Sequence, residues 1–224
     1  FTVANFNILD LCNCFASVSA TPVSNIVCFG NNDGIASAIT TGMSNPISYT
    51  WSNGGTSQNI SGLAAGNYTV TASGLNGCSA TSTTTITEPS QLIATVSSST
   101  DVTCFGGNDG SLSISVSGGI ASYDYLWSNG ATTANINSIA AGNYSVTATG
   151  NNGCTATTSA MINQASMINI TSTTTDESCA GNDGIASTTV SGGVAPYSYS
   201  WSNTAITGNI SNLTFGLYTL TVTD

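Results

Sequence analysis

The sequence predicts an all-β protein made of tandem immunoglobulin-like antiparallel β-sandwich domains. Three motifs recur along its 224 residues, first after 76 residues and then after 74: a Trp-Ser-Asn triplet, a Gly-x-Tyr motif and an Asn-Asp-Gly turn. A period of this length fits a small autonomous domain and is too long for a solenoid unit. Short alternating runs between Gly-, Asn- and Asp-rich turns, with no helical periodicity, indicate β-strands. The recurring residues are Trp51, Trp127 and Trp201; Tyr68, Tyr144 and Tyr218; and Asp33, Asp109 and Asp183.

This period divides the chain into an N-terminal extension and three repeats. The extension comprises residues 1–14, and the repeats comprise residues 15–90, 91–166 and 167–224. The third repeat is shorter than the others, so it is expected to lack its last strand. The junctions near Glu88–Gln91 and Asn163–Ser166 are short and polar, which favours stiff connections over flexible spacers.

The middle repeat illustrates the expected elements. Leu112, Ile114 and Val116 alternate with serine, which is typical of a half-buried strand. Trp127 ends a later strand, where a sandwich places a large core aromatic, and Tyr144 is expected to form a tyrosine corner. Seven short strands are expected, at 92–96, 102–104, 111–116, 123–127, 134–136, 144–148 and 154–162.

Composition excludes several classes of function. The chain has no Lys, Arg or His and ten acidic residues. Binding to nucleic acid or to anionic lipid needs basic side chains, so neither is expected. Without His, a Ser or Cys nucleophile has no ordinary base. A pair of carboxylates is the one catalytic route left, and only Asp176 and Glu177 are adjacent in sequence. An enzyme is therefore not expected, and no apolar run is long enough to span a membrane.

The seven cysteines are Cys12, Cys14, Cys28, Cys78, Cys104, Cys154 and Cys179. Fifty residues separate Cys28 from Cys78, and fifty separate Cys104 from Cys154. One pair per repeat at constant spacing predicts the disulfides Cys28–Cys78 and Cys104–Cys154, and hence an oxidising compartment. Buried free thiols are the alternative.

The Asp33, Asp109 and Asp183 turns are weak candidates for calcium binding, because carboxylates and backbone carbonyls are ligands that calcium prefers. The alternative is that each aspartate only stabilises its turn. No other metal and no cofactor is expected.

Five motifs occur in order in the middle repeat, from Cys-Phe-Gly-Gly-Asn-Asp-Gly-Ser, through Val-Ser-Gly-Gly and Tyr-x-Tyr-x-Trp-Ser-Asn-Gly, to Ala-Ala-Gly-Asn-Tyr-Ser-Val-Thr-Ala and Asn-Gly-Cys-Thr-Ala-Thr. Over about residues 25 to 224 the chain resembles the SprB repeat of very large surface adhesins of gliding Bacteroidetes. The resemblance implies a secreted or cell-surface protein, exported by the type IX route, that acts in adhesion or surface structure. It implies no catalytic residues.

The two ends of the chain predict head-to-tail assembly. Residues 1–10 are β-prone and apolar, with Phe1, Val3, Phe6 and Ile8 as candidate donor-strand residues. They are expected to complete the third repeat of another copy, as in donor-strand complementation, and to build a surface filament. Cys12 or Cys14 of one copy is the candidate partner of Cys179 in another. The alternatives are that the chain is an excerpt of a longer adhesin, or that the repeats are an array of modules that bind surface polysaccharide.

Overall fold

The computed structural model of the chain describes residues 14–75, 77–179 and 181–224. These residues form seventeen strands in antiparallel sheets and no helix, which confirms the prediction of an all-β protein. Accordingly, no helix in the described part of the chain could cross a membrane.

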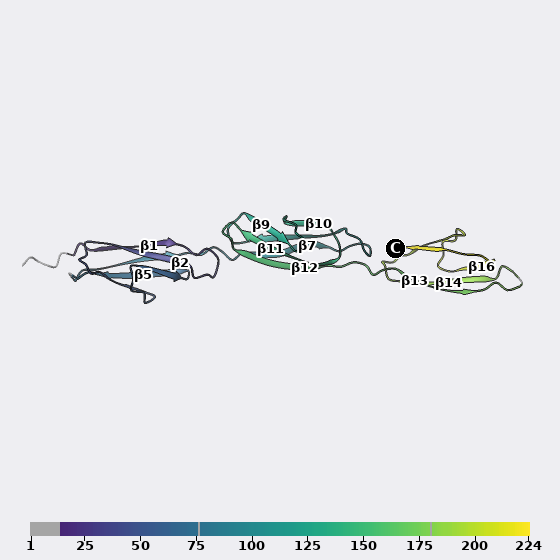
Figure 1. Cartoon of the computed structure of the whole chain (residues 1–224), viewed down its shortest axis with the longest axis horizontal. Helices are drawn as coiled ribbons and strands as arrows, with labels where there is room; N and C mark the ends of the chain where they lie inside the picture. Colours follow the sequence, from purple (N-terminus) through teal and green to yellow (C-terminus); the bar gives the residue numbers. More distant parts are fainter. Residues whose placement is uncertain (1–13, 76, 180) are drawn as a thin grey trace, which may run out of the picture. The chain divides into compact units, whose positions relative to one another are not determined.

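The first repeat is a sandwich of two three-stranded sheets (Figure 1). One sheet has the strand order β1-β2-β4 and the other has the order β3-β5-β6. These orders correspond to sheets A-B-E and C-F-G of an immunoglobulin domain without strand D. The strands are β1 (Ser17–Ser24), β2 (Gly34–Thr41), β3 (Ser48–Trp51), β4 (Asn59–Leu63), β5 (Gly66–Ser73) and β6 (Ser79–Ile86).

The second repeat has the same two sheets, with the orders β10-β8-β7 and β12-β11-β9. Its strands are β7 (Ile93–Thr100), β8 (Gly110–Ser117), β9 (Tyr123–Trp127), β10 (Asn135–Ile139), β11 (Gly142–Gly150) and β12 (Thr155–Ile162). Six strands form where seven were predicted. Residues 102–104 are not a strand, because Val102 makes only an isolated parallel bridge to Gln164.

The third repeat has five strands among the described residues. Its first sheet has the order β13-β14-β16, and its second has only β15 and β17. The strands are β13 (Asn169–Thr175), β14 (Gly184–Ser191), β15 (Ser198–Trp201), β16 (Ile210–Leu213) and β17 (Leu220–Thr223). No described strand therefore lies beside β17 on the side that β6 occupies beside β5.

Contacts between residues divide the chain into two compact units. One contains the described residues up to Ala94 together with Val116–Asp124 and Thr147–Thr157. The other contains Thr95–Ser115, Tyr125–Val146 and Thr158–Asp224. The first repeat thus lies in one unit and the third in the other, while the second repeat contributes to both.

The recurring tryptophans are core residues, as predicted. Trp51, Trp127 and Trp201 are all buried. Each indole N–H donates to a backbone carbonyl six residues later, at 2.8–2.9 Å, so the polar atom of the ring is satisfied inside the sandwich.

The predicted tyrosine corners are also confirmed. The hydroxyls of Tyr68, Tyr144 and Tyr218 each donate to the backbone carbonyl four residues earlier, at 2.9–3.1 Å. In the first two repeats this bond ties the start of β5 or β11 to the turn before it, and in the third it ties the segment just before β17 to residue 214.

A recurring glycine sets the turn that leaves the second strand of each repeat. Gly118 has a φ of +74°, which favours glycine, and a Cβ there would lie 1.9 Å from the carbonyl oxygen of Gln91. Gly42 and Gly192 repeat this arrangement. Only glycine allows the turn to pack this closely on the start of the first strand.

Candidate functional site

The cysteines pair differently from the prediction. Cys14 is bonded to Cys78 and Cys28 to Cys154, each with a Cα–Cα distance of 5.6 Å. The predicted pairs Cys28–Cys78 and Cys104–Cys154 were therefore wrong. Cys14 also has a partner within its own chain, which corrects its assignment as a candidate for an intersubunit bond.

The reason lies in the position of each cysteine along the sandwich. Cys28 lies in the loop between β1 and β2, where the N–H of Gly30 donates to Glu88 just after β6. Cys78 immediately precedes β6, at its other end. An eight-residue strand is about 26 Å long, whereas bonded cysteines have Cα atoms within about 7 Å. The two cysteines of one repeat lie at opposite ends and cannot meet.

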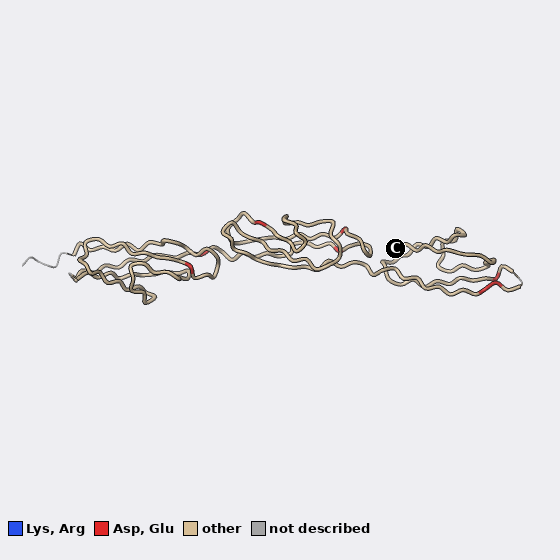
Figure 2. Tube along the Cα trace, in the orientation of Figure 1, with Lys and Arg blue, Asp and Glu red and all other residues tan. Residues whose placement is uncertain are grey.

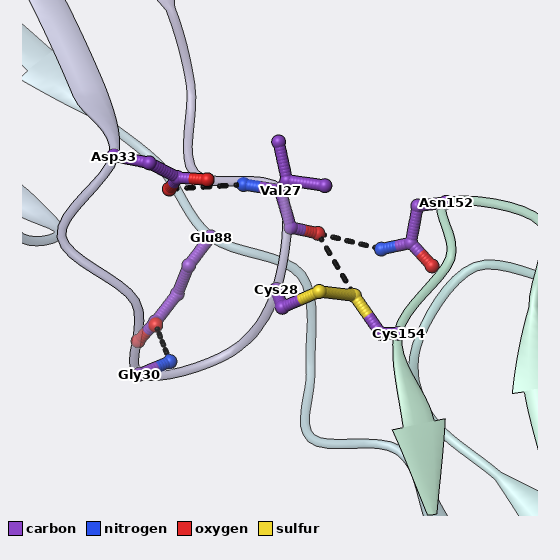
Figure 3. The surroundings of a disulfide bond; sticks show 7 residues. All are labelled: Val27, Cys28, Gly30, Asp33, Glu88, Asn152 and Cys154. Atoms are coloured by element: carbon purple, nitrogen blue, oxygen red, sulfur yellow. Dashed lines mark hydrogen bonds between the residues drawn. A yellow bond between two sulfur atoms is a disulfide. The ribbon is translucent and has the colours of Figure 1, made fainter.

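Figure 3 shows the bond that joins the first repeat to the second. The side-chain amide of Asn152 donates to the carbonyl of Val27 at 2.6 Å, and the same carbonyl lies 3.3 Å from the sulfur of Cys154. Val27, Cys28, Asn152 and Cys154 all belong to one compact unit. A hydrogen bond therefore accompanies the covalent link between these two repeats.

Cys104 and Cys179 are free and exposed in the described part of the chain. Cys179 therefore stays available for the predicted bond between copies. Cys12 and the donor-strand candidates Phe1, Val3, Phe6 and Ile8 lie outside the described residues.

The weak calcium candidates have structural partners. Asp109 accepts hydrogen bonds from the N–H and the hydroxyl of Thr103, at 3.1 and 2.6 Å, and these bonds lower its pKa. Asp33 accepts from the N–H of Val27. Asp183 accepts from the N–H of Ser178, and hydrogen bonds from Ser178 lower its pKa. Each carboxylate thus closes the loop that precedes the second strand of its repeat.

Acidic residues lie singly along the described chain, apart from Asp176 and Glu177, and Figure 2 shows no basic residue among them. No cluster of three or more His, Cys, Asp or Glu side chains that could hold a metal occurs in the described ranges.

A groove of about 540 Å³ lies in the third repeat. Its walls include the buried Trp201 and Leu213 and the exposed Phe215 and Leu217. Phe215 is 97% exposed and Leu217 is 89% exposed, although both are large and apolar. This groove is lined by residues of β13 and β14 and by the segment 213–218 that leads into β17. Among the described residues, β17 pairs only with β15.

The first repeat shows what fills the corresponding space. Its buried cluster has eight residues and includes Ile86 from β6, whereas the cluster of the third repeat has four. A Cβ on Gly34 would lie 2.7 Å from Cγ2 of Ile86. At Gly184, the equivalent position, the nearest atoms belong only to Leu213. The space that Ile86 fills in the first repeat is therefore open in the third.

The complete repeats also hold the backbone just after this isoleucine. The side-chain oxygen of Asn25 accepts the N–H of Thr87 at 3.0 Å, and the N–H of Ile26 donates to the carbonyl of Thr87 at 3.0 Å. This reciprocal pair fixes the end of β6 to the loop that contains Cys28.

In the second repeat, Asp101 accepts the N–H of Asn163 at 2.9 Å, and the N–H of Val102 donates to the carbonyl of Asn163 at 2.9 Å. Hydrogen bonds from the backbone N–H and then the side-chain amide of Asn163 lower the pKa of Asp101. Asp176 occupies the equivalent position in the third repeat, three residues before Cys179. In the sequence, Asp176 stands out only as one of two adjacent acids, but its constant distance from the loop cysteine marks it as the counterpart of Asn25 and Asp101.

The family model of the SprB repeat matches residues 20–56, 96–132 and 171–205. A search of curated protein sequences found no match.

Among solved structures, the chain is similar to the three N-terminal domains of the highly immunogenic outer capsid protein of bacteriophage RB49, with 19% identity and a TM-score of 0.45, over 86% of this chain and 80% of that one. It is also similar to the eight N-terminal immunoglobulin domains of Down syndrome cell adhesion molecule, with 15% identity and a TM-score of 0.41, over 83% of this chain and 28% of that one. A tetra-tandem repeat from the extending region of a large adhesion protein matches with 14% identity and a TM-score of 0.25, over 93% of this chain and 65% of that one.

Proposed function

The chain carries three SprB repeats, and from that premise we propose that it is an extracellular structural or adhesive repeat protein whose copies assemble head to tail into a surface filament. In this proposal, residues 1–10 of one copy supply the last strand of the third repeat in the next copy. Strand addition of this kind uses main-chain hydrogen bonds for affinity and side-chain pockets for specificity. A head-to-tail contact between different surfaces builds an open filament.

The open groove beside residues 213–218, together with the unpaired edge of β17 among the described residues, is the observation that carries this proposal. Soluble proteins rarely leave an unpaired strand edge next to an apolar groove, because such an edge pairs with other chains. Phe215 and Leu217 border this groove, and both would lose contact with water if a strand were bound there.

Carbohydrate binding is supported less well. Sugar-binding modules present exposed aromatic rings, whereas Trp51, Trp127 and Trp201 are buried and hydrogen-bonded. Phe215 is the one exposed aromatic among the described residues that line the groove. The groove therefore favours a polypeptide strand over a surface polysaccharide.

The same groove would also accept the next strand of a longer chain of repeats, which is the alternative to assembly from separate copies. Electron microscopy of the purified 224-residue chain distinguishes the two. Filaments that disappear when residues 1–10 are deleted support the proposal. Isolated particles of the intact chain at high concentration, or filaments that survive the deletion, contradict it.

A further inference from the structure

Granted the proposed filament, we infer that Ile8 is the residue by which the donor segment of a second copy is anchored. Ile8 packs against Gly184, as Ile86 packs against Gly34 and Ile162 against Gly110 in the complete repeats. Asp176 of the receiving copy then accepts the backbone N–H of Leu9. This assignment fixes the register of the donor segment, Phe1–Asp10, in the groove of the third repeat.

The anchor position is defined by glycine at the start of the second strand. A Cβ on Gly34 would lie 2.7 Å from Cγ2 of Ile86, and a Cβ on Gly110 would lie 2.9 Å from Cγ2 of Ile162. In both repeats the missing side chain makes room for an isoleucine from the last strand. Gly184 keeps this room in the third repeat, and it lines the open groove.

The receiving carboxylate is defined by the residue that follows the anchor. Thr87 and Asn163 each come directly after the anchoring isoleucine, and their N–H groups donate to Asn25 and Asp101. Asp176 stands at the same position in the third repeat, is exposed, and also lines the groove. The backbone N–H of a bound strand would therefore meet a side-chain oxygen there, as it does in the two complete repeats.

The donor sequence supports this register. The two last strands end in Ile86-Thr87-Glu88 and Ile162-Asn163-Gln164, and the candidate donor contains Ile8-Leu9-Asp10. In this register Phe6 takes the place of Thr84, which is buried in the first repeat. Glu88, which corresponds to Asp10 in this register, accepts the loop N–H of Gly30 in the first repeat. In the third repeat the loop N–H of Asn182 already donates to Glu177, so no such contact is assigned to Asp10.

The rim of the groove is more apolar than the equivalent positions of the first repeat. Phe215 replaces Ala65 of the first repeat, and Leu217 replaces Asn67, whose side chain accepts the hydroxyl of Thr85 from β6. A polar contact in the complete repeat thus becomes an apolar surface in the open one. Leu9, which follows the anchor, would lie next to Phe215.

Peptide binding to the full chain tests this inference. The receiving protein carries Ile8→Asp, so that its own N-terminal segment does not occupy the groove of another copy. Two fluorescent peptides are titrated: residues 1–10, and residues 79–88 of the first repeat, which carry Ile86. Both are expected to bind.

Substitutions in the receiving protein then separate a positioning role of Asp176 from a general effect of charge. Asp176→Ala is expected to weaken binding of both peptides about tenfold, as for loss of a hydrogen bond to a charged group. Asp176→Asn should change binding less than about threefold, because the side-chain oxygen of Asn25 accepts the corresponding backbone N–H in the first repeat. Asp124→Ala removes an equally exposed charge elsewhere and should have no effect.

Within the donor peptide, Ile8→Ala should weaken binding, whereas Asn5→Ala should not. If peptide 79–88 binds in a way that depends on Asp176 while peptide 1–10 does not bind, the assignment of Ile8 is overturned and the filament loses its donor, but Asp176 keeps its role. If neither peptide binds, the Asp176 site is overturned, and microscopy of the intact chain still decides the filament independently.

Discussion

Cys28 and Cys154 are bonded across 126 residues, and the bond joins a loop of the first repeat to the β11–β12 hairpin of the second. The carbonyl of Val27, next to Cys28, accepts a hydrogen bond from Asn152, next but one to Cys154. The covalent link and the hydrogen bond therefore hold the same two segments together.

Non-reducing peptide mapping should recover the pairs Cys14–Cys78 and Cys28–Cys154. Thiol labelling of the native chain should modify Cys104 and Cys179, because both are free and exposed. Recovery of a Cys28–Cys78 peptide would contradict the structure, since those residues lie at opposite ends of one sandwich.

Cys28→Ser should lower the free energy of unfolding by about 2–4 kcal/mol, because a long loop in the unfolded chain is no longer closed. The measurement is chemical denaturation under non-reducing conditions. Cys104→Ser is the matched control, since it changes the equivalent residue of the next repeat without breaking a bond. An equal loss in both variants would show that the serine, not the lost bond, causes the effect.

Gly110→Ala should destabilise the second repeat by about 1–3 kcal/mol, as overpacking does. The new Cβ would lie 2.8 Å from the carbonyl of Ile139 and 2.9 Å from Cγ2 of Ile162. Gly142→Ala, in the same repeat, places its Cβ 3.8 Å from the ring of Tyr144 and should change stability little. Urea denaturation of both variants compares them; equal midpoints would mean that the anchor site has spare room.

Tyr144→Phe removes the hydroxyl that donates to the carbonyl of Ala140 at 2.9 Å. The expected cost is about 0.5–1.5 kcal/mol, the usual net contribution of one hydrogen bond. Tyr125→Phe removes a hydroxyl from a half-buried tyrosine of the same repeat and should cost less. Thermal melting curves of the two variants decide whether the tyrosine corner has the assigned role.

Acid should weaken the fold through Asp101 and Asp109. Hydrogen bonds from Asn163 and Thr103 hold the pKa values of these carboxyls below the ordinary value of about 3.9. A lowered pKa in the folded state contributes stability above the unfolded value, and this contribution is lost as pH falls through the folded pKa. Stability should therefore be flat from neutral pH to about 5 and fall below about 4.

Asp109→Asn should flatten this acid dependence, because an amide does not titrate. Denaturation midpoints measured from pH 7 to pH 2 give the comparison, and Asp124→Asn serves as the control at an exposed aspartate. A wild-type chain that gained stability on acidification would contradict the assignment.

The strands and core could be predicted from the sequence because local patterns determine them. The alternation of Leu112, Ile114 and Val116 and the position of Trp127 define inward-facing positions without reference to distant residues. Leu112, Ile114 and Trp127 are buried and Val116 is half-buried. The cysteine pairing could not be predicted in this way. In a repeated sequence, the spacing of cysteines along the chain is equally compatible with a bond within one repeat, such as Cys28–Cys78, and with a bond between repeats, such as Cys28–Cys154. The two can be distinguished only once it is known that Cys28 and Cys78 lie at opposite ends of one sandwich.

The candidate groove was predicted only in outline. An open edge in the third repeat was expected from the length of that repeat, whereas the position proposed for Asp176 is marked only by the hydrogen bonds that Asn25 and Asp101 make to residues 62 positions away. Phe215 and Leu217 stand where the other repeats have Ala and Asn. This difference is visible in the sequence, but it can be interpreted only once both residues are known to line an open groove.

The Cys28–Cys154 bond also limits how far the first two repeats can be stretched. Between Cys14 and Cys154, the shortest covalent path runs through 14 residues to Cys28 and then crosses the bond to Cys154. Even with every hydrogen bond broken, this path extends to only about 50 Å, at about 3.5 Å per residue. Without the Cys28–Cys154 bond, the Cys14–Cys78 bond would leave 76 residues, or about 270 Å. Under tension, therefore, unfolding of these two repeats would increase the distance between Cys14 and Cys154 only slightly. The chain would transmit a pulling force without lengthening much.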